Sequence, residues 1–243
     1  MPDIFPPNTL GEALLAELRN APRRRVQRIE AAGRAYWVKQ VEDLSLRWRL
    51  QKGNPRRAFE KERRGLHVLR DAGLPVPPIV AEGPSLLVTQ DSGPTLDRLV
   101  REPDASEAGL LPAMAAAGTA LAQMHMRGFA HGRPSIKDIC WDGEQVTFID
   151  LERFSPRRGV RRRHVVDLIA LVFSIHVYAP QMPGLALAAA DAYRASGDLG
   201  VWRGAQRLCA LLRPLDLLTR SLQQRPSGRE FRAIPLTLQS FSR

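Results

Sequence analysis

Apolar residues recur along the chain at two spacings, one typical of strands and one typical of helices. Runs of β-branched and aromatic residues predict strands over 25–30, 35–41 and 85–90. Apolar residues three and four positions apart predict helices over 9–20, 56–71, 115–127, 165–177, 185–196 and 203–222. Gly33 indicates a hairpin between the first two strands, while Gly73 and Gly128 each follow the end of a helix. Strands therefore concentrate early in the chain and helices later, which is an α+β order.

A second, shorter hairpin is predicted in the middle of the chain. Apolar runs at 139–141 and 146–149 flank Asp142-Gly143-Glu144, a turn sequence that accommodates positive φ. The hairpin would hold Asp138 and Asp150 at neighbouring strand ends. Two carboxylates held together repel each other unless a divalent cation lies between them. The pair predicts a Mg²⁺ site, although a turn cap or an arginine partner would explain either aspartate alone.

The segment 131–150 follows the order of a protein-kinase catalytic loop and its metal-binding turn, H-R-D-x-x-x-x-N and D-F-G. Aligned on His131, Arg133 takes the place of the general base and Asp138 the place of the Asn. Asp150 takes the place of the D-F-G Asp. Three polar groups of this kind converge on one nucleotide phosphate in kinases. Arg133, Asp138 and Asp150 are therefore the candidate catalytic residues, and the two aspartates are the candidate metal ligands.

Lys39 lies in the middle of a predicted strand, where kinases carry their phosphate-binding lysine. A lysine on the solvent face of the strand is the plainer alternative. Of two glutamates in the following helix, Glu62 shares the apolar stripe of Leu66 and Leu69, and Glu60 lies off it. We expect Glu62 to pair with Lys39 and to hold it toward a nucleotide. The alternative is a surface glutamate that forms pairs within the arginine-rich helix.

The strand at 85–90 runs into a linker with turn chemistry, which is where the hinge of a two-lobed kinase lies. Thr89, Gln90 and Asp91 are the candidate hinge residues, whose backbone would read the adenine edge of ATP. Asp167 lies within a predicted buried helix. Because a buried carboxylate is costly without donors, we expect it to accept hydrogen bonds from a loop backbone. A helix cap or an arginine pair is the alternative.

The 243 residues carry a formal net charge of +11, so the surface attracts anions. Much of the charge is arginine, in clusters at 23–25, 56–57, 63–64, 157–158 and 161–163. Anionic sugar or glycolipid, an anionic membrane surface and nucleic acid are the candidate partners, and a merely solvated face is the alternative. Nucleic acid ranks last, because no recognition helix, zinc finger or aromatic-interleaved RNA motif accompanies the charge.

Other features of the composition indicate a protein of the cytoplasm. No apolar run approaches the roughly 20 residues of a membrane span, and the first residues lack the pattern of a signal peptide. Cys140 and Cys209 lie far apart in apolar runs, without the spacing of metal ligands. We therefore expect neither a disulfide nor a zinc site.

The ordered features between residues 26 and 171 resemble the lipopolysaccharide kinase branch of the protein-kinase-like superfamily, which phosphorylates Kdo or heptose. The matching pieces are Trp37-Val38-Lys39, the helix with Glu62 and the following 72–77, 121–125 before Gly128, His131-Gly132, 148–151 and Asp167-Leu168. The resemblance implies a two-lobed kinase-like fold, with a small β-rich N-lobe at 1–90 and a larger helical C-lobe at 91–243. It also implies ATP and Mg²⁺ as cofactors, a sugar hydroxyl of a glycolipid as acceptor, and a cytoplasmic location peripheral to the inner membrane.

The sequence departs from the kinase pattern at several positions. Arg133 cannot accept a proton, Asp138 replaces Asn, and Glu152 replaces the Gly of D-F-G. Gly33 stands alone where kinases have a glycine-rich loop. Two hypotheses follow, a slow phosphotransferase and a catalytically impaired pseudokinase that acts as an envelope-associated scaffold or regulator. A third, a helical protein that binds nucleic acid through charge alone, predicts steep salt dependence and no role for Asp150.

Overall fold

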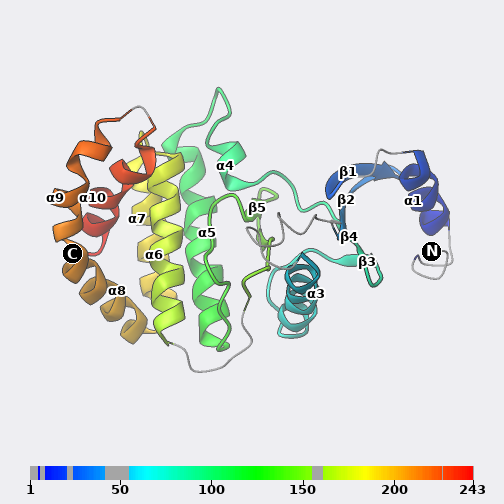
Figure 1. The fold of residues 1–243 in the computed structure, drawn as a ribbon, viewed down its shortest axis with the longest axis horizontal. Coiled ribbons are helices and arrows are strands. Elements are labelled where there is room, and N and C mark those ends of the chain that lie inside the picture. Colours follow the sequence, from blue (N-terminus) through cyan, green and yellow to red (C-terminus); the bar gives the residue numbers. More distant parts are fainter. Residues whose placement is uncertain are drawn as a thin grey trace.

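The computed structural model describes residues 5, 9–20, 24–41, 55–154, 161–225 and 227–242. Along the long axis of the molecule, a small sheet with two helices occupies one end and a larger group of helices the other (Figure 1). The predicted α+β, two-lobed arrangement is thereby confirmed. Arg23, Arg157 and Arg158 of the predicted basic clusters lie outside the described residues.

The sheet of the small lobe is antiparallel and has the strand order β1-β2-β4-β3. Its strands are β1 (Val26–Ala31), β2 (Arg34–Gln40), β3 (Ile79–Glu82) and β4 (Leu86–Gln90). Gly33 supplies a φ of +72° in the tight turn between β1 and β2, as the predicted hairpin requires. On one side of the sheet, helix α1 (Thr9–Asn20) buries Leu14 in a cluster with Val38 and Val88.

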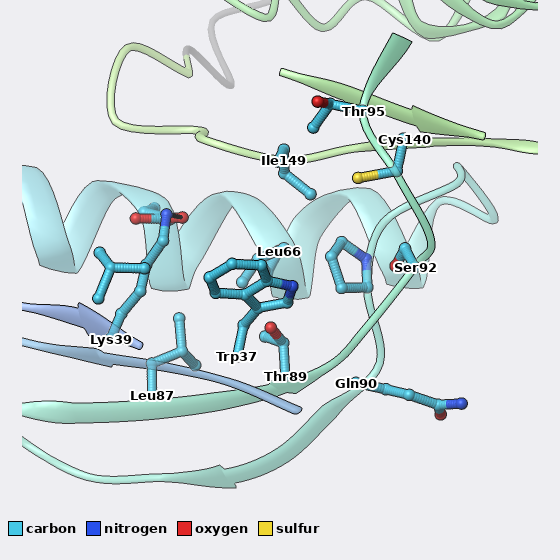
Figure 2. Close-up of a pocket in the computed structure, with 13 residues that line it drawn as sticks. Trp37, Lys39, Leu66, Leu87, Thr89, Gln90, Ser92, Thr95, Cys140 and Ile149 are labelled. Atoms are coloured by element: carbon cyan, nitrogen blue, oxygen red, sulfur yellow. Dashed lines mark hydrogen bonds and ion pairs between the residues drawn. The ribbon is translucent and has the colours of Figure 1, made fainter. Parts of the chain in front are cut away.

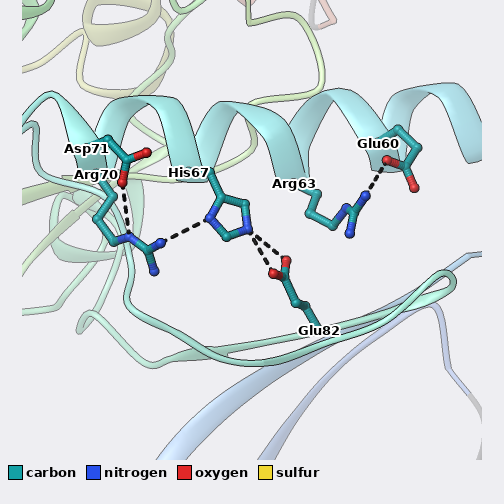
Figure 3. A network of polar contacts seen from close by, with 6 residues as sticks. All are labelled: Glu60, Arg63, His67, Arg70, Asp71 and Glu82. Atoms are coloured by element: carbon teal, nitrogen blue, oxygen red, sulfur yellow. Dashed lines mark hydrogen bonds and ion pairs between the residues drawn. The ribbon is translucent and has the colours of Figure 1, made fainter. Parts of the chain in front are cut away.

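Helix α3 (Pro55–Asp71) packs against the opposite side of the sheet. Leu87 belongs to the same core cluster as Leu66 and Leu69 of α3, whereas its neighbour Val88 belongs to the α1 cluster. This division follows from the alternation of side chains along a strand. Figure 3 shows a second connection, in which His67 Nε2 of α3 lies 2.9 Å from both carboxylate oxygens of Glu82 on β3.

The large lobe combines helices with one short hairpin. Its elements are α4 (Leu96–Leu99), α5 (Glu107–Met126), β5 (Ile139–Trp141), β6 (Val146–Phe148), α6 (Arg161–Tyr178), α7 (Pro183–Ser196), α8 (Leu199–Leu212), α9 (Pro214–Gln223) and α10 (Arg229–Ser240). Helices α5 and α7 approach so closely that a Cβ at Gly118 would lie 2.1 Å from the carbonyl oxygen of Ala189. No helix among the described residues is long and apolar enough to cross a membrane.

The helical periodicity placed the starts of α5, α6 and α8 too late and missed the break between α8 and α9. Helix α5 begins at Glu107, earlier than the expected 115, because Ser106 caps it by accepting a hydrogen bond from Gly109 N. The single helix expected over 203–222 is two helices that meet at Arg213. Pro214 has no N–H to donate to the preceding turn, which ends α8 and begins α9.

Candidate functional site

A cavity of about 200 Å³ lies between the sheet, α3 and the β5–β6 hairpin. The side chains around it are mostly apolar and include Val26, Trp37, Leu66, Leu87, Cys140 and Ile149. Figure 2 shows the indole of Trp37 within this lining and Lys39 at one end of it. A mostly apolar cleft with a few polar groups at its edge is the common form of a small-molecule site.

Lys39 on β2 and Glu62 on α3 form an ion pair at the edge of the cavity. The Glu62 side chain is only 7% exposed, and burial raises the pKa of its carboxyl, while the charge of Lys39 opposes this shift. Glu60 instead pairs with Arg63 at 2.9 Å (Figure 3), and neither of the two lines the cavity. The expected pairing of Lys39 with Glu62 rather than with Glu60 is confirmed.

The three candidate hinge residues occupy different positions. Thr89 and Gln90 line the cavity, together with Ser92 and Thr95, which are not among the predicted site residues. Asp91 does not line it.

The carboxylate of Asp91 is held on the other side of the linker. It accepts hydrogen bonds from Arg28 Nε at 2.7 Å and from Gly93 N at 3.1 Å. The backbone amide of Asp91 donates to Ala35 O, and that of Gln90 donates to Pro78 O. Neither amide is therefore open to a ligand in this conformation.

The loop that begins at His131 is fixed from both sides. Gly132 N donates to both carboxylate oxygens of Asp167, each at 3.1 Å, and Asp167 is 1% exposed. This confirms the expected role of Asp167 as an acceptor for loop backbone. On the other side, His131 Nε2 lies 3.3 Å from Ile149 O, which connects the loop to the chain leaving β6.

The backbone of this loop adopts positive φ at two successive residues. Gly132 has a φ of +98°, and a Cβ there would lie 2.3 Å from Arg153 O. Arg133 has a φ of +136°, a value that residues with a side chain rarely adopt. The Arg133 side chain is exposed, and its positive charge acts to lower the pKa of Asp138. Arg133 therefore lies near enough to Asp138, one of the two candidate metal ligands, to influence its pKa.

Asp138 and Asp150 are brought together by the hairpin, since Ile149 N donates to Asp138 O at 2.8 Å. Burial, and next the negative charge of Asp150, raise the pKa of Asp138 to about 7. A cation between the two carboxylates would neutralise the buried negative charge and the repulsion between Asp138 and Asp150. Carboxylate oxygens are the ligands that Mg²⁺ prefers. The donor set therefore fits a divalent ion.

A third carboxylate lies close by. Oxygens of Glu62, Asp150 and Glu152 all lie within 4.8 Å of one another, and Glu152 also binds Arg25 Nη2 at 2.5 Å. In the sequence, Glu152 is notable only as a departure from D-F-G. Its spacing of two residues from Asp150 was the available signal, but only the fold shows its proximity to Glu62.

Comparison with known proteins gives a family and a relative. The model of the lipopolysaccharide kinase (Kdo/WaaP) family matches residues 12–191, which is well over half of the chain. An uncharacterized protein of Haemophilus influenzae is 32% identical over 135 residues. That similarity covers 56% of this chain and 56% of the relative, so it spans little more than half the length of either.

Proposed function

Because the chain belongs to the lipopolysaccharide kinase (Kdo/WaaP) family, we propose that it transfers a phosphoryl group from ATP to a sugar hydroxyl of a lipopolysaccharide-type glycolipid. One observation carries this proposal. Lys39, Glu62, Asp138 and Asp150 come from four separate segments, yet they are electrostatically coupled beside a single apolar cavity. The proposal places the protein at the cytoplasmic side of the inner membrane, where such a glycolipid would be reached.

The cavity offers complementary surfaces to the two ends of a nucleotide. Its apolar walls, with Trp37 and Ile149, suit an aromatic base, and Thr89, Gln90 and Ser92 lie at its edge. Lys39, held by Glu62, would contact phosphate oxygens. Asp138 and Asp150 would hold Mg²⁺, which neutralises phosphate charge when bound.

Arg133 changes what this chain can contribute to the transfer. Its guanidinium cannot accept the proton of the acceptor hydroxyl, and general base catalysis is typically worth about 10²–10⁴-fold. Positioning and charge neutralisation supply most of the remainder in phosphoryl transfer. In this proposal, exposed Arg133 binds the anionic acceptor or the γ-phosphate, and the enzyme is slow.

The second candidate function is a pseudokinase scaffold, favoured by Arg133 and by the hairpin of β1 and β2, whose only glycine is Gly33. It retains nucleotide or partner binding without transfer. Against it stands the cost in folding stability of holding two carboxylates close together, where the pKa of Asp138 rises to about 7. A bound cation would offset this cost, and a scaffold without a cation would not.

An assay of label transfer separates the two functions. The protein is incubated with γ-labelled ATP, Mg²⁺ and a dephosphorylated lipopolysaccharide-core glycolipid, and label in the glycolipid is measured. We expect slow transfer by the wild type and at least a 100-fold loss in Asp150→Ala. Glu144→Ala, an exposed glutamate in the turn of the same hairpin, is the matched control and should transfer normally. Nucleotide binding without any transfer would assign the scaffold function instead.

A further inference from the structure

The outer surface formed by α8 and α9 exposes an unusual number of leucines. Leu211, Leu217 and Leu218 are 75%, 62% and 73% exposed, and Leu215 is 38% exposed. Single exposed leucines are ordinary on a protein surface, but contiguous ones mark an interaction site. Figure 1 shows α8 and α9 along the outer edge of the helical lobe, at the end of the molecule opposite the sheet.

Helix α9 is turned the opposite way from an ordinary surface helix, which faces its apolar stripe inward. None of its residues is buried. Its polar residues Asp216, Thr219 and Gln223 are half-buried and bonded to one another, with Gln223 Nε2 donating to Asp216 Oδ1 at 3.0 Å and to Thr219 Oγ1 at 3.2 Å. The leucines at 211, 215 and 218 follow helical spacing across the junction at Arg213 and are exposed. The apolar stripe therefore faces solvent.

Positive charge accompanies these leucines along α8 and α9. Between residues 199 and 225 the exposed charged side chains are all arginines: Arg203, Arg207, Arg213, Arg220 and Arg225. Asp216 is the one acidic residue of that stretch, and it is held by Gln223. A helix with an exposed leucine stripe and flanking arginines has the chemistry of a segment that lies in the surface of an anionic bilayer.

We propose that the α8–α9 surface docks the protein on an anionic phospholipid bilayer, with the leucines in the interfacial layer and the arginines on lipid phosphates. Pairing with a second copy is disfavoured, because a symmetric contact would bring two sets of five arginines together. At ten residues, α9 lies on a bilayer and does not span it. The proposal rests on the membrane location proposed above and is independent of phosphoryl transfer.

Flotation of the full chain with lipid vesicles, without nucleotide or glycolipid, tests this surface. Vesicles of phosphatidylcholine alone are compared with vesicles that contain phosphatidylglycerol. We expect binding only to the anionic vesicles, weakening with salt. Leu211→Ser combined with Leu218→Ser should weaken binding by about tenfold or more. The matched control combines Met126→Ser with Val166→Ser, two other exposed apolar residues, 63% and 52% exposed, and should bind as the wild type does.

A charge variant provides the second readout. Arg213→Gln with Arg220→Gln should weaken binding to anionic vesicles by at least about tenfold, whereas Arg98→Gln with Arg127→Gln should weaken it less. Equal binding by the leucine variant and the wild type would overturn the proposal, as would the absence of vesicle binding by the wild type. A wild-type dimer in sedimentation equilibrium that the leucine variant dissociates would assign the surface to a second copy. Because no transfer is measured, failure here leaves the proposed activity untouched.

Discussion

The carboxyl of Asp138 keeps its proton up to about neutral pH, because it is buried and because Asp150 places a second negative charge nearby. In the unfolded chain its pKa returns to about 4. Between those two values the folded state holds a proton that the unfolded state has lost. Stability therefore falls as pH rises from about 4 to about 7, and the whole cost is present above pH 7.

Asp138→Asn should remove this cost. In metal-free protein we expect the variant to be more stable than the wild type at pH 8, by about 1–3 kcal/mol, with a smaller gain at pH 5. Urea denaturation at the two pH values measures the difference. Equal stability of the two proteins at pH 8 would show that Asp138 is not strained by Asp150 and burial.

Asp142 is the matched control, because its pKa is shifted the other way. Its carboxylate accepts hydrogen bonds from the backbone amides of Gln145 and Glu144, which lower its pKa. Such a group contributes stability above its unfolded pKa and loses it as pH falls. Asp142→Asn should thus give no gain at pH 8, where Asp138→Asn gives its largest.

Single residues were predictable where periodicity decided between them. Glu62 and Glu60 are two positions apart on one helix, and only Glu62 shares the buried stripe, so its orientation followed from helix geometry. The outward position of Asp91 was not predictable. It depends on a hydrogen bond from Arg28 of β1, which lies 63 positions away in the sequence. The register of β1 against β2, which places Arg28 beside Asp91, cannot be read from the sequence.

At the scale of elements, the His131 loop depends on a glycine that meets two constraints at once. Gly132 combines a φ of +98° with a close approach to Arg153 O, and its amide serves Asp167. Gly143 in the β5–β6 turn has a similar φ of +109°, but nothing lies within 4 Å of a Cβ there. A substitution at Gly143 would therefore introduce backbone strain alone, whereas a substitution at Gly132 would introduce both backbone strain and steric overlap.

Gly132→Ala should destabilise the protein by about 3–5 kcal/mol, because strain and overlap add. Gly143→Ala carries only the strain and should cost about 1–2 kcal/mol. Chemical denaturation of both variants measures the difference. Equal losses would mean that the loop moves away from Arg153 at little cost, and that its position is less fixed than the contacts indicate.

Helices and strands with strong periodicity were predictable, whereas the helical stretches around an interior proline were not. Helix α5 carries Pro112 in its interior and α10 carries Pro235, so their periodic patterns appear interrupted in the sequence. Packing compensates for the lost hydrogen bonds: the first part of α5 buries Leu110 and Ala113, and α10 buries Ala233 and Thr237. Local helix propensity does not take such tertiary contacts into account.

Across the whole molecule, the candidate site is assembled from both lobes. The Lys39–Glu62 pair belongs to the small lobe, and Asp138 and Asp150 belong to the hairpin of the large one. Arg25 and Glu152 join the lobes across 127 positions of sequence. The motif order predicted that these groups converge, because each segment matches a kinase motif. Contacts outside the motifs, such as Arg25–Glu152, became visible only in three dimensions.

The thermal stability of the wild type with and without ATP and Mg²⁺ tests most directly the claim that this assembled site binds nucleotide. A ligand that binds only the native state stabilises it by about 2.7 kcal/mol at 100 times its Kd, which for a chain of this size raises Tm by roughly 5–10 °C. We predict a metal-dependent rise of Tm in the wild type and in Glu144→Ala, and none in Asp150→Ala. No rise in the wild type, or an equal rise in Asp150→Ala, would contradict the account.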